Sequence, residues 1–507
     1  MYALPLSLGH ISLVCIGLLT YVLTNRINHS RRPPGSAVAW VLLIVAFPYL
    51  GLPLYLLFGS RKLVKALPVH QVHWSAPKPD RGLQAEPRWA HEVLVAVEAP
   101  PVVLAPELHF EADGRIALLG VLDCIDAAEH ELCVCTFVLG NDEVASRIID
   151  ALVVAVHRGV RVRLLIDAIG SLALRRARMQ LLLRNGVELR RFMPIFRNPV
   201  RGRTNLRNHR KCIIVDGRRV WTGGRNLAAE YYLDQPMHPA WLDMSFQATG
   251  PIAEQFLAIF ESDWAQASQP LLWGQSKATG QSLAHGAIDA FYRLQDTWHH
   301  VADLVKASMP GYLTPGSAQT GDMAPQTLQA QTMQLIPSGP DYQDDTIYTL
   351  LLTGFFQARH SITIVTPYFV PDDTLTAALT LAARRGVRVQ LLIPKVSNHR
   401  LADIARMRPL RLIAQAGGEV YWIAHMAHAK AFIIDEQIAM SGSANLDTRS
   451  MFLNYEMMAA FYSPEAIASL TQWARQLQAA STRYEFTPPG FARDVLEGLV
   501  RAVAFEL

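Results

Sequence analysis

Residues 148–171 read IIDALVVAVHRGVRVRLLIDAIGS, and residues 375–398 read LTAALTLAARRGVRVQLLIPKVSN. Both stretches begin with apolar residues at helical spacing, turn at RGV, and continue into a short apolar strand. A β-rich run precedes each stretch, at 131–139 and at 361–370. Because unrelated segments do not share the same order of elements, this recurrence indicates an internal duplication.

The duplication predicts the fold class and the domain organisation. Strands that alternate with helices favour a mixed or mainly parallel sheet covered by helices. The chain has 507 residues, too many for one ordinary hydrophobic core. We therefore expect an α/β fold with two pseudo-symmetric lobes. The expected units are a membrane hairpin at 1–62, a connector at 63–105, a first lobe at 106–267, a Gly-, Ser- and Pro-containing linker at 268–330, and a second lobe at 331–507.

The same set of polar residues follows each copy of the repeat. The first copy, RNHRKCIIVDGRRVWTGGRN at 207–226, contains His209, Lys211, Asp216, Gly224 and Asn226. The second, AHAKAFIIDEQIAMSGSAN at 427–445, contains His428, Lys430, Asp435, Ser443 and Asn445. Residues two apart on a strand point to the same face, so each histidine projects beside its lysine.

These side chains suit the chemistry of a phosphodiester. Lysine ammonium groups bind phosphate oxygens, and asparagine amides and backbone N–H groups beside glycine can hold the others. Histidine can act as a nucleophile, an acid or a base near neutral pH. One such motif alone is typical of a solvated strand end. Two at identical spacing place a histidine on each side of the phosphorus, which predicts phosphoryl transfer without a metal ion or other cofactor.

The N-terminus is predicted to be a helical hairpin in a membrane. Residues 4–24 and 37–58 contain no charged side chain, and each run is about the length that spans a bilayer core. No basic residue precedes Arg26, which disfavours a cleavable signal peptide. Buried core helices are the alternative. Basic residues flank both sides of the second run, so charge does not fix the orientation. Five cysteines without zinc or disulfide spacing favour a cytoplasmic placement of the lobes.

Charge and composition indicate the kind of partner. Half of the residues are hydrophobic and the net charge is only +4, but arginine is dense between 158 and 219. This basic region runs into a phosphate-handling motif in a membrane-tethered chain, which favours anionic lipid headgroups. The region lacks interleaved aromatic residues for stacking bases, so we expect no nucleic acid partner. The oligomeric state is left open.

The paired HxKxxxxD…GGxN and HxKxxxxD…GSxN motifs resemble those of the phospholipase D superfamily, and the chain more narrowly resembles its bacterial cardiolipin synthases. The resemblance also covers LYLLFGSRK at the end of the second apolar run, FESDW at 260–264, PSGPD at 337–341, TPYFVPD at 366–372 and SANLDTRSMFLNYE at 443–456. It implies two phospholipase D-type lobes, a multi-pass protein of the bacterial inner membrane, and phosphatidylglycerol as the substrate.

The resemblance also implies a mechanism. One phosphatidylglycerol would give its phosphatidyl group to His209, releasing glycerol with a proton from His428, and a second would accept it to form cardiolipin. Lys211, Lys430, Asn226 and Asn445 would bind the phosphate, while Asp216 and Asp435 would support the motif. Glu230 and Glu456 would orient the opposite histidines, or form structural salt bridges instead. A hydrolytic phospholipase D, another phosphatidyltransferase and a catalytically silent lipid-binding protein are the alternatives.

Overall fold

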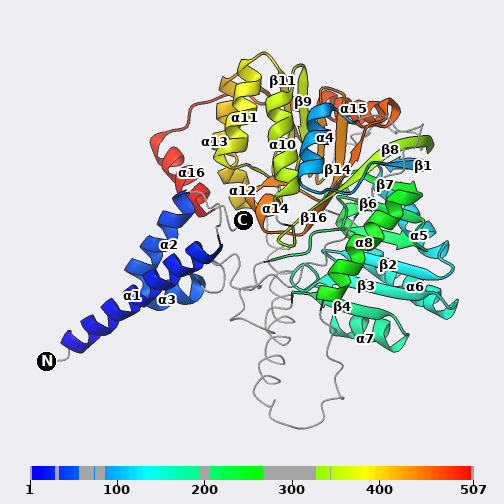
Figure 1. The fold of residues 1–507 in the computed structure, drawn as a ribbon, viewed down its shortest axis with the longest axis horizontal. Coiled ribbons are helices and arrows are strands. Elements are labelled where there is room, and N and C mark those ends of the chain that lie inside the picture. Colours follow the sequence, from blue (N-terminus) through cyan, green and yellow to red (C-terminus); the bar gives the residue numbers. More distant parts are fainter. Residues whose placement is uncertain are drawn as a thin grey trace, which may run out of the picture.

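The computed structural model describes residues 3–28, 34–55, 74, 86–193, 206–236, 238–267, 327–342 and 344–503. Residues 268–326 of the predicted linker lie outside the described residues, as do 56–73 and 75–85 of the hairpin end and connector. The remaining chain forms one large sheet with helices on both faces, and a group of N-terminal helices at its side (Figure 1).

The first lobe follows helix α4 (Arg88–Ala96). Its elements are β1 (Val103–Glu111), α5 (Gly114–Asp126), β2 (Glu131–Thr136), α6 (Glu143–His157), β3 (Arg161–Asp167), α7 (Arg176–Arg184), β4 (Glu188–Phe192), β5 (Cys212–Val215), β6 (Arg219–Gly223), the short helix η3 (Ala229–Tyr231), β7 (Ser245–Thr249) and α8 (Pro251–Gln266).

The second lobe repeats this order with additions. Its elements are β8 (Thr327–Ser338), α10 (Thr346–Gln357), β9 (Ser361–Val365), β10 (Phe369–Val370), α11 (Asp373–Arg384), β11 (Arg388–Pro394), α12 (Arg400–Ala405), α13 (Met407–Gln415), β12 (Glu419–Ile423), β13 (Ala431–Ile434), β14 (Ile438–Gly442), β15 (Leu446–Asp447), α14 (Thr448–Phe452), β16 (Glu456–Phe461), α15 (Pro464–Ala479), β17 (Thr482–Arg483) and α16 (Phe491–Val503).

The two lobes share a 15-stranded sheet, in the order β17-β12-β11-β9-β13-β14-β16-β8-β1-β7-β6-β5-β2-β3-β4. The lobes meet at the antiparallel pair β1 and β8, and the strand order outward from this pair is equivalent on both sides. Three outer strands of each lobe are parallel, β2-β3-β4 and β9-β11-β12, and the inner ones are antiparallel; the short edge strand β17, antiparallel to β12, has no counterpart among the described residues of the first lobe. The predicted mixed α/β sheet is therefore confirmed.

The helices of the repeat begin and end in the same way. At the start of α6 the Asp142 carboxylate accepts a hydrogen bond from Ala145 N (2.9 Å), and Asp372 caps α11 in the same way through Leu375 N. Both helices end at the RGV turn, where Gly159 and Gly386 have φ of +92° and +87°. These angles favour glycine, so the glycine ends the helix and turns the chain into the next strand.

Three apolar clusters hold the helices on the sheet. One cluster is shared by the lobes and lies under α8 and α15; in it Phe461 of the second lobe contacts Phe110 and Phe246 of the first at 5.2 Å between ring centroids. The other two lie on the opposite face, under α5 and α6 in the first lobe and under α10, α11 and α13 in the second. The shared cluster fixes the two lobes against each other.

The N-terminal helices differ in part from the predicted hairpin. Helix α1 (Ala3–Asn28) covers the first apolar run, but the second run is divided into α2 (Pro34–Ala46) and α3 (Pro48–Leu54). The break falls at Phe47 because the ring of the following Pro48 disfavours helical geometry at the residue before it. In the part of the chain that the structure describes, no helix combines the length and the apolar character needed to cross a membrane.

Candidate active site

Both motif histidines lie at the edge of the sheet where the parallel strands end. The first residue of β5 pairs with the end of β2, and the first residue of β13 pairs with the end of β9. Each histidine is also held by the other lobe: His209 N donates to Tyr455 O (2.9 Å), and His428 N donates to Leu242 O (2.6 Å). These backbone contacts bring the two motifs into one site between the lobes.

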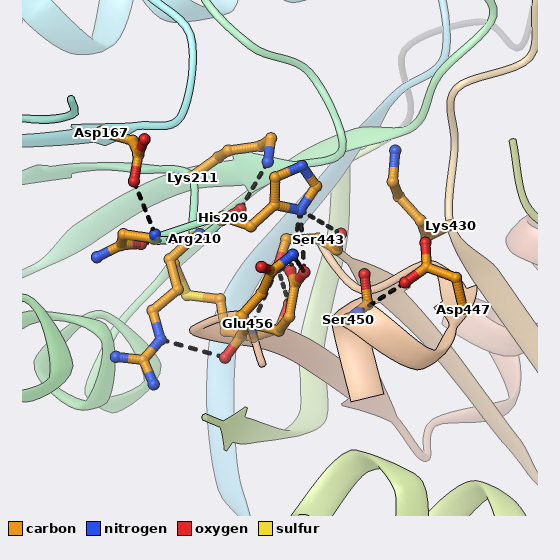
Figure 2. A network of polar contacts seen from close by, with 12 residues as sticks. Asp167, His209, Arg210, Lys211, Lys430, Ser443, Asp447, Ser450 and Glu456 are labelled. Carbon is orange, nitrogen blue, oxygen red and sulfur yellow. Dashed lines mark hydrogen bonds and ion pairs between the residues drawn. The ribbon is translucent and has the colours of Figure 1, made fainter. Parts of the chain in front are cut away.

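His209 is fixed by a carboxylate of the second lobe. Its Nδ1 lies 3.1 Å from Glu456 Oε2 and 3.1 Å from the backbone oxygen of Ser443. Figure 2 shows the ring between the Lys211 and Lys430 side chains, with Glu456 on its Nδ1 side. Both acceptors require a proton on Nδ1, so a neutral His209 carries its lone pair on Nε2. That is the form of histidine that can attack phosphorus.

His428 is fixed in the same way by a carboxylate of the first lobe. Its Nδ1 lies 2.9 Å from Asp243 Oδ2, and both side chains are buried. Asp243 and Glu456 are equivalent in the two lobes. Gly223 pairs with Ser245, two residues after Asp243. In the same way, Gly442 pairs with Met458, two residues after Glu456. Each lobe therefore supplies the carboxylate for the histidine of the other.

The sequence predicted that Glu230 orients His428, but the carboxylate at His428 Nδ1 is that of Asp243. Glu230 lies in the short helix η3, where its backbone oxygen accepts a hydrogen bond from Trp241 N (2.8 Å). Sequence spacing misled the assignment because the loop between the motif asparagine and the carboxylate is longer in the first lobe, 227–242, than in the second, 446–455. Position relative to the following strand is the sequence signal that could identify Asp243. Asp243 stands just before the strand SFQAT, and Glu456 stands at the start of the equivalent strand EMMAAF.

Both motif lysines are buried next to their histidines. Lys211 Nζ donates to the His209 backbone oxygen (2.6 Å), and Lys430 Nζ lies 3.1 Å from His428 Nε2. Burial lowers the pKa of Lys211 to about 8 and that of Lys430 to about 7, although Asp243 and Glu456 oppose the shift. The cost of holding two cations away from water falls when an anion enters beside them.

Burial favours the neutral form of both histidines. Burial lowers the pKa of His428 to about 3, and the neighbouring Lys430 cation adds to this while Asp243 opposes it. Burial also lowers the pKa of His209, against the opposing charge of Glu456. Burial alone would raise the pKa of Asp243 and Glu456, but their histidine partners hold both below the ordinary value. The site therefore has charged carboxylates facing neutral imidazoles.

The glycine, serine and asparagine positions differ between the motifs. A Cβ on Gly224 would lie 2.3 Å from Asp243 Oδ1, so glycine is needed there, whereas Ser443 Oγ donates to Glu456 Oε2 (2.5 Å). The Asn226 amide binds Val138 N and the Tyr231 hydroxyl. Asn445 is also buried, and its Oδ1 has no hydrogen-bond partner among the described residues. An acceptor left open in the site suits a donor from a ligand.

The motif aspartates lie away from the histidines, at the far ends of the four-residue strands β5 and β13. Asp216 accepts hydrogen bonds from three backbone N–H groups, those of residues 129–131, at the turn that enters β2. Asp435 does the same for residues 359–361 at the turn that enters β9. These carboxylates hold the ends of adjacent strands together through backbone hydrogen bonds.

Two further features of the site were not predicted. Arg210 is buried between the lobes, where it pairs with Asp263 of the first lobe (2.6 Å) and donates to Glu456 O of the second (3.2 Å). The rings of Tyr231, Trp241 and Tyr368 surround His428, with centroids 5.0, 5.7 and 6.4 Å from its own. The motif FESDW contains Asp263, but only tertiary contact pairs it with Arg210. Among the described residues, no group of three or more His, Cys, Asp or Glu side chains could hold a metal ion.

The sequence matches a family model described as "Cardiolipin synthase, PLD-like domain" at residues 121–264 and 351–478, and one described as "Phospholipase_D-nuclease N-terminal" at 13–60. It is 27% identical to cardiolipin synthase 1 of Bacillus anthracis over 94% of this chain and 89% of that protein. It is 28% identical to major cardiolipin synthase ClsA of Bacillus subtilis over 85% of each chain. The crystal structure of phosphatidylserine synthase from Haemophilus influenzae, 15% identical, covers 82% of this chain and 100% of that chain with a TM-score of 0.58.

Proposed function

The chain belongs to the cardiolipin synthase family with phospholipase D-like domains, and from this premise we propose that it is a phosphatidyltransferase that makes cardiolipin from two molecules of phosphatidylglycerol. The observation that carries the proposal is the pair of buried histidines, each bound at Nδ1 by a carboxylate of the opposite lobe. A carboxylate at Nδ1 favours a proton on that atom and so places the lone pair of each neutral ring on Nε2, which suits displacement at one phosphorus from two sides.

In the first half of the reaction, His209 Nε2 attacks the phosphorus of one phosphatidylglycerol. The P–N bond forms as the P–O bond to the headgroup glycerol breaks, and the His428 imidazolium gives its proton to the departing oxygen. Glycerol leaves, and the phosphatidyl group stays on His209. In the second half, His428 removes the proton from a hydroxyl of another phosphatidylglycerol. The oxygen attacks phosphorus, the P–N bond breaks, and cardiolipin leaves with both histidines restored.

Substrate binding supplies the charge that this cycle needs. Burial and the Lys430 cation lower the pKa of His428 to about 3, so by itself this imidazole is neutral and has no proton to give. The negative phosphodiester enters beside Lys211 and Lys430, raises the pKa of nearby basic groups, and thereby favours protonation of His428. The lysines then stabilise the charge that develops on the phosphate oxygens. Asn445 Oδ1 accepts a hydrogen bond from a hydroxyl of the headgroup glycerol.

We propose that the apolar N-terminus holds the active site at a membrane. The match of residues 13–60 to a phospholipase D N-terminal segment supports attachment of the chain to the inner membrane through this part. The thiols of the lobes support a cytoplasmic position for the site, since Cys124, Cys133, Cys135 and Cys212 are free and buried. Labelling of a cysteine introduced on α6 by an impermeant reagent, with intact and lysed spheroplasts, tests this orientation.

Product analysis tests the proposed function. Purified protein is given phosphatidylglycerol labelled in the headgroup glycerol, in buffer with a chelator. Cardiolipin and free labelled glycerol in equal amounts are the expected products. Phosphatidic acid without cardiolipin would make the protein a hydrolase, and no product in any buffer would contradict an enzymatic role. His425→Ala is the matched control for His428→Ala, because His425 lies three residues earlier without the lysine and aspartate spacing.

A further inference from the structure

Helix α16 exposes apolar side chains that a protein in water would bury. Phe491 is 87% exposed, and Val495 and Leu496 are about half exposed. These residues recur at helical spacing and so lie on one side of the helix. Leaving three large apolar side chains in water is costly, and such a patch marks a surface that contacts something apolar.

Two charged side chains of α16, Glu497 and Arg501, attach it to the second lobe. Glu497 is only 2% exposed and binds Arg411 of α13 at 2.6 Å. Arg501 binds Asp373 at the start of α11, also at 2.6 Å. Surface helices of globular proteins normally turn their apolar side to the core and their charges to water. Helix α16 departs from this pattern: these two charged side chains form ion pairs with the lobe, while its three exposed apolar side chains face outward and, of the large apolar side chains that the structure describes in it, only Val500 is buried.

The outward side of α16 continues onto the N-terminal helices. Helix α16 contacts α2 as well as α12, and Figure 1 shows it (red) lying between α2 (blue) and the second lobe. On α2 and the residue after it, Leu42, Val45 and Phe47 are exposed too. The apolar surfaces of α16 and α2 thus belong to adjoining elements.

We propose that α16 is an interfacial helix that lies in the surface of the lipid bilayer, with Phe491, Val495 and Leu496 among the acyl chains and its ion pairs holding the second lobe above them. A bilayer fits better than a protein partner because the apolar surface adjoins α2, most of which lies in the uncharged apolar run 37–58, and attachment of this run to the membrane is part of the proposed function. The inference goes beyond the proposed function, since it concerns docking on lipid and not the transfer step.

The position of α16 also relates the lipid surface to the active site. Val500 of α16 lies in a small buried cluster with Val370, Ala402 and Ala405, and Tyr368 packs against this cluster. The Tyr368 ring is one of the three that surround His428. Docking of α16 on the bilayer therefore sets the His428 side of the site near the lipid from which an acceptor hydroxyl would come.

Depth-dependent fluorescence quenching tests the proposal. The exposed Cys15 is replaced by serine, and Leu496→Cys is labelled with an environment-sensitive fluorophore in the full chain on phosphatidylglycerol vesicles. Lipids brominated along the acyl chain should quench this label. The matched control is Val154→Cys on α6, which is equally exposed but distant from the N-terminal helices and should show no loss of fluorescence.

Two results would overturn the proposal. The first is equal and negligible quenching at the two labelled positions while the protein remains on the vesicles. The second is efficient crosslinking between copies of the chain through Leu496→Cys, which would make the apolar side of α16 a contact between subunits. Both readouts are independent of turnover, so they stand or fall separately from the proposed transferase activity.

Discussion

At the scale of single residues, the site depends on two carboxylates that fix the histidine tautomers from across the lobe boundary. Asp243→Asn and Glu456→Gln keep the shape of each side chain, but an amide can present its N–H₂ to Nδ1 and turn the ring to the wrong tautomer. We expect kcat to fall roughly 10²–10⁴-fold in each variant with little change in KM.

Glu230→Gln is the comparison for this prediction, because Glu230 is an acid of the same region, whereas the carboxylate 2.9 Å from His428 Nδ1 belongs to Asp243. Its kcat should stay within about twofold of the unaltered protein. A kcat of Asp243→Asn equal to that of Glu230→Gln would show that the Asp243 contact is not needed for turnover.

The buried state of His428 predicts a dependence of stability on pH. The unfolded chain binds a proton at this histidine below an ordinary pKa of 6.5, whereas the folded chain does not until about 3. The unfolded state therefore gains protons as the pH falls from 7, and this group then lowers the free energy of unfolding by about 2 kcal/mol at pH 5.

The His428→Gln variant lacks this penalty. Its thermal unfolding midpoint should rise relative to the unaltered protein as the buffer is changed from pH 8 to pH 5. A difference in midpoint that stays constant over this range would contradict a neutral, buried His428.

At the scale of elements, the motif aspartates are predicted to act through turns. Asp216 has φ of +50° while it accepts three backbone N–H groups, and aspartate and asparagine tolerate this left-handed geometry better than alanine. Asp216→Ala should lower the free energy of unfolding by about 2 kcal/mol, and Asp216→Asn by less.

The folded fraction of either variant should retain its kcat, measured per folded molecule, since Asp216 lies at the far end of β5 from His209. A large loss of kcat in a well-folded Asp216→Asn protein would place the aspartate in the chemistry instead.

Elements with local signals were predictable from the sequence. Asp142 and Asp372 cap the repeated helices and Gly159 and Gly386 end them, so apolar periodicity and turn residues were enough. The break at Phe47 was not predicted, because the prediction relied on the length of the uncharged apolar run and did not consider the effect of Pro48 on the residue before it. Asp243 was missed because its pairing with His428 spans 185 residues and crosses the lobes, which no local pattern encodes.

At the scale of the whole molecule, the shared sheet makes the site a property of both lobes together. Arg210 of the first lobe bonds to Ser338 O and Glu456 O of the second, and its charge is balanced by Asp263. Removing this guanidinium leaves a buried carboxylate unpaired at the lobe boundary.

Arg210→Ala should therefore lower the free energy of unfolding by about 3–5 kcal/mol. The control is Arg115→Ala, which removes an exposed arginine of the first lobe and should change the same quantity by less than about 0.5 kcal/mol. Equal effects in denaturant titrations of the two variants would mean that the boundary does not depend on Arg210.

Mass spectrometry of the covalent intermediate tests the central claim, that a histidine pair shared by two lobes transfers a phosphatidyl group. The protein is mixed with phosphatidylglycerol, quenched within the first turnover by cold denaturant at mildly alkaline pH, where both the P–N bond and the acyl esters survive, and digested. We predict the phosphatidyl mass on the peptide that contains His209, absent from His209→Ala and present when His425 is replaced. Turnover to cardiolipin without any modified histidine, or with the mass on His428 alone, would contradict the account.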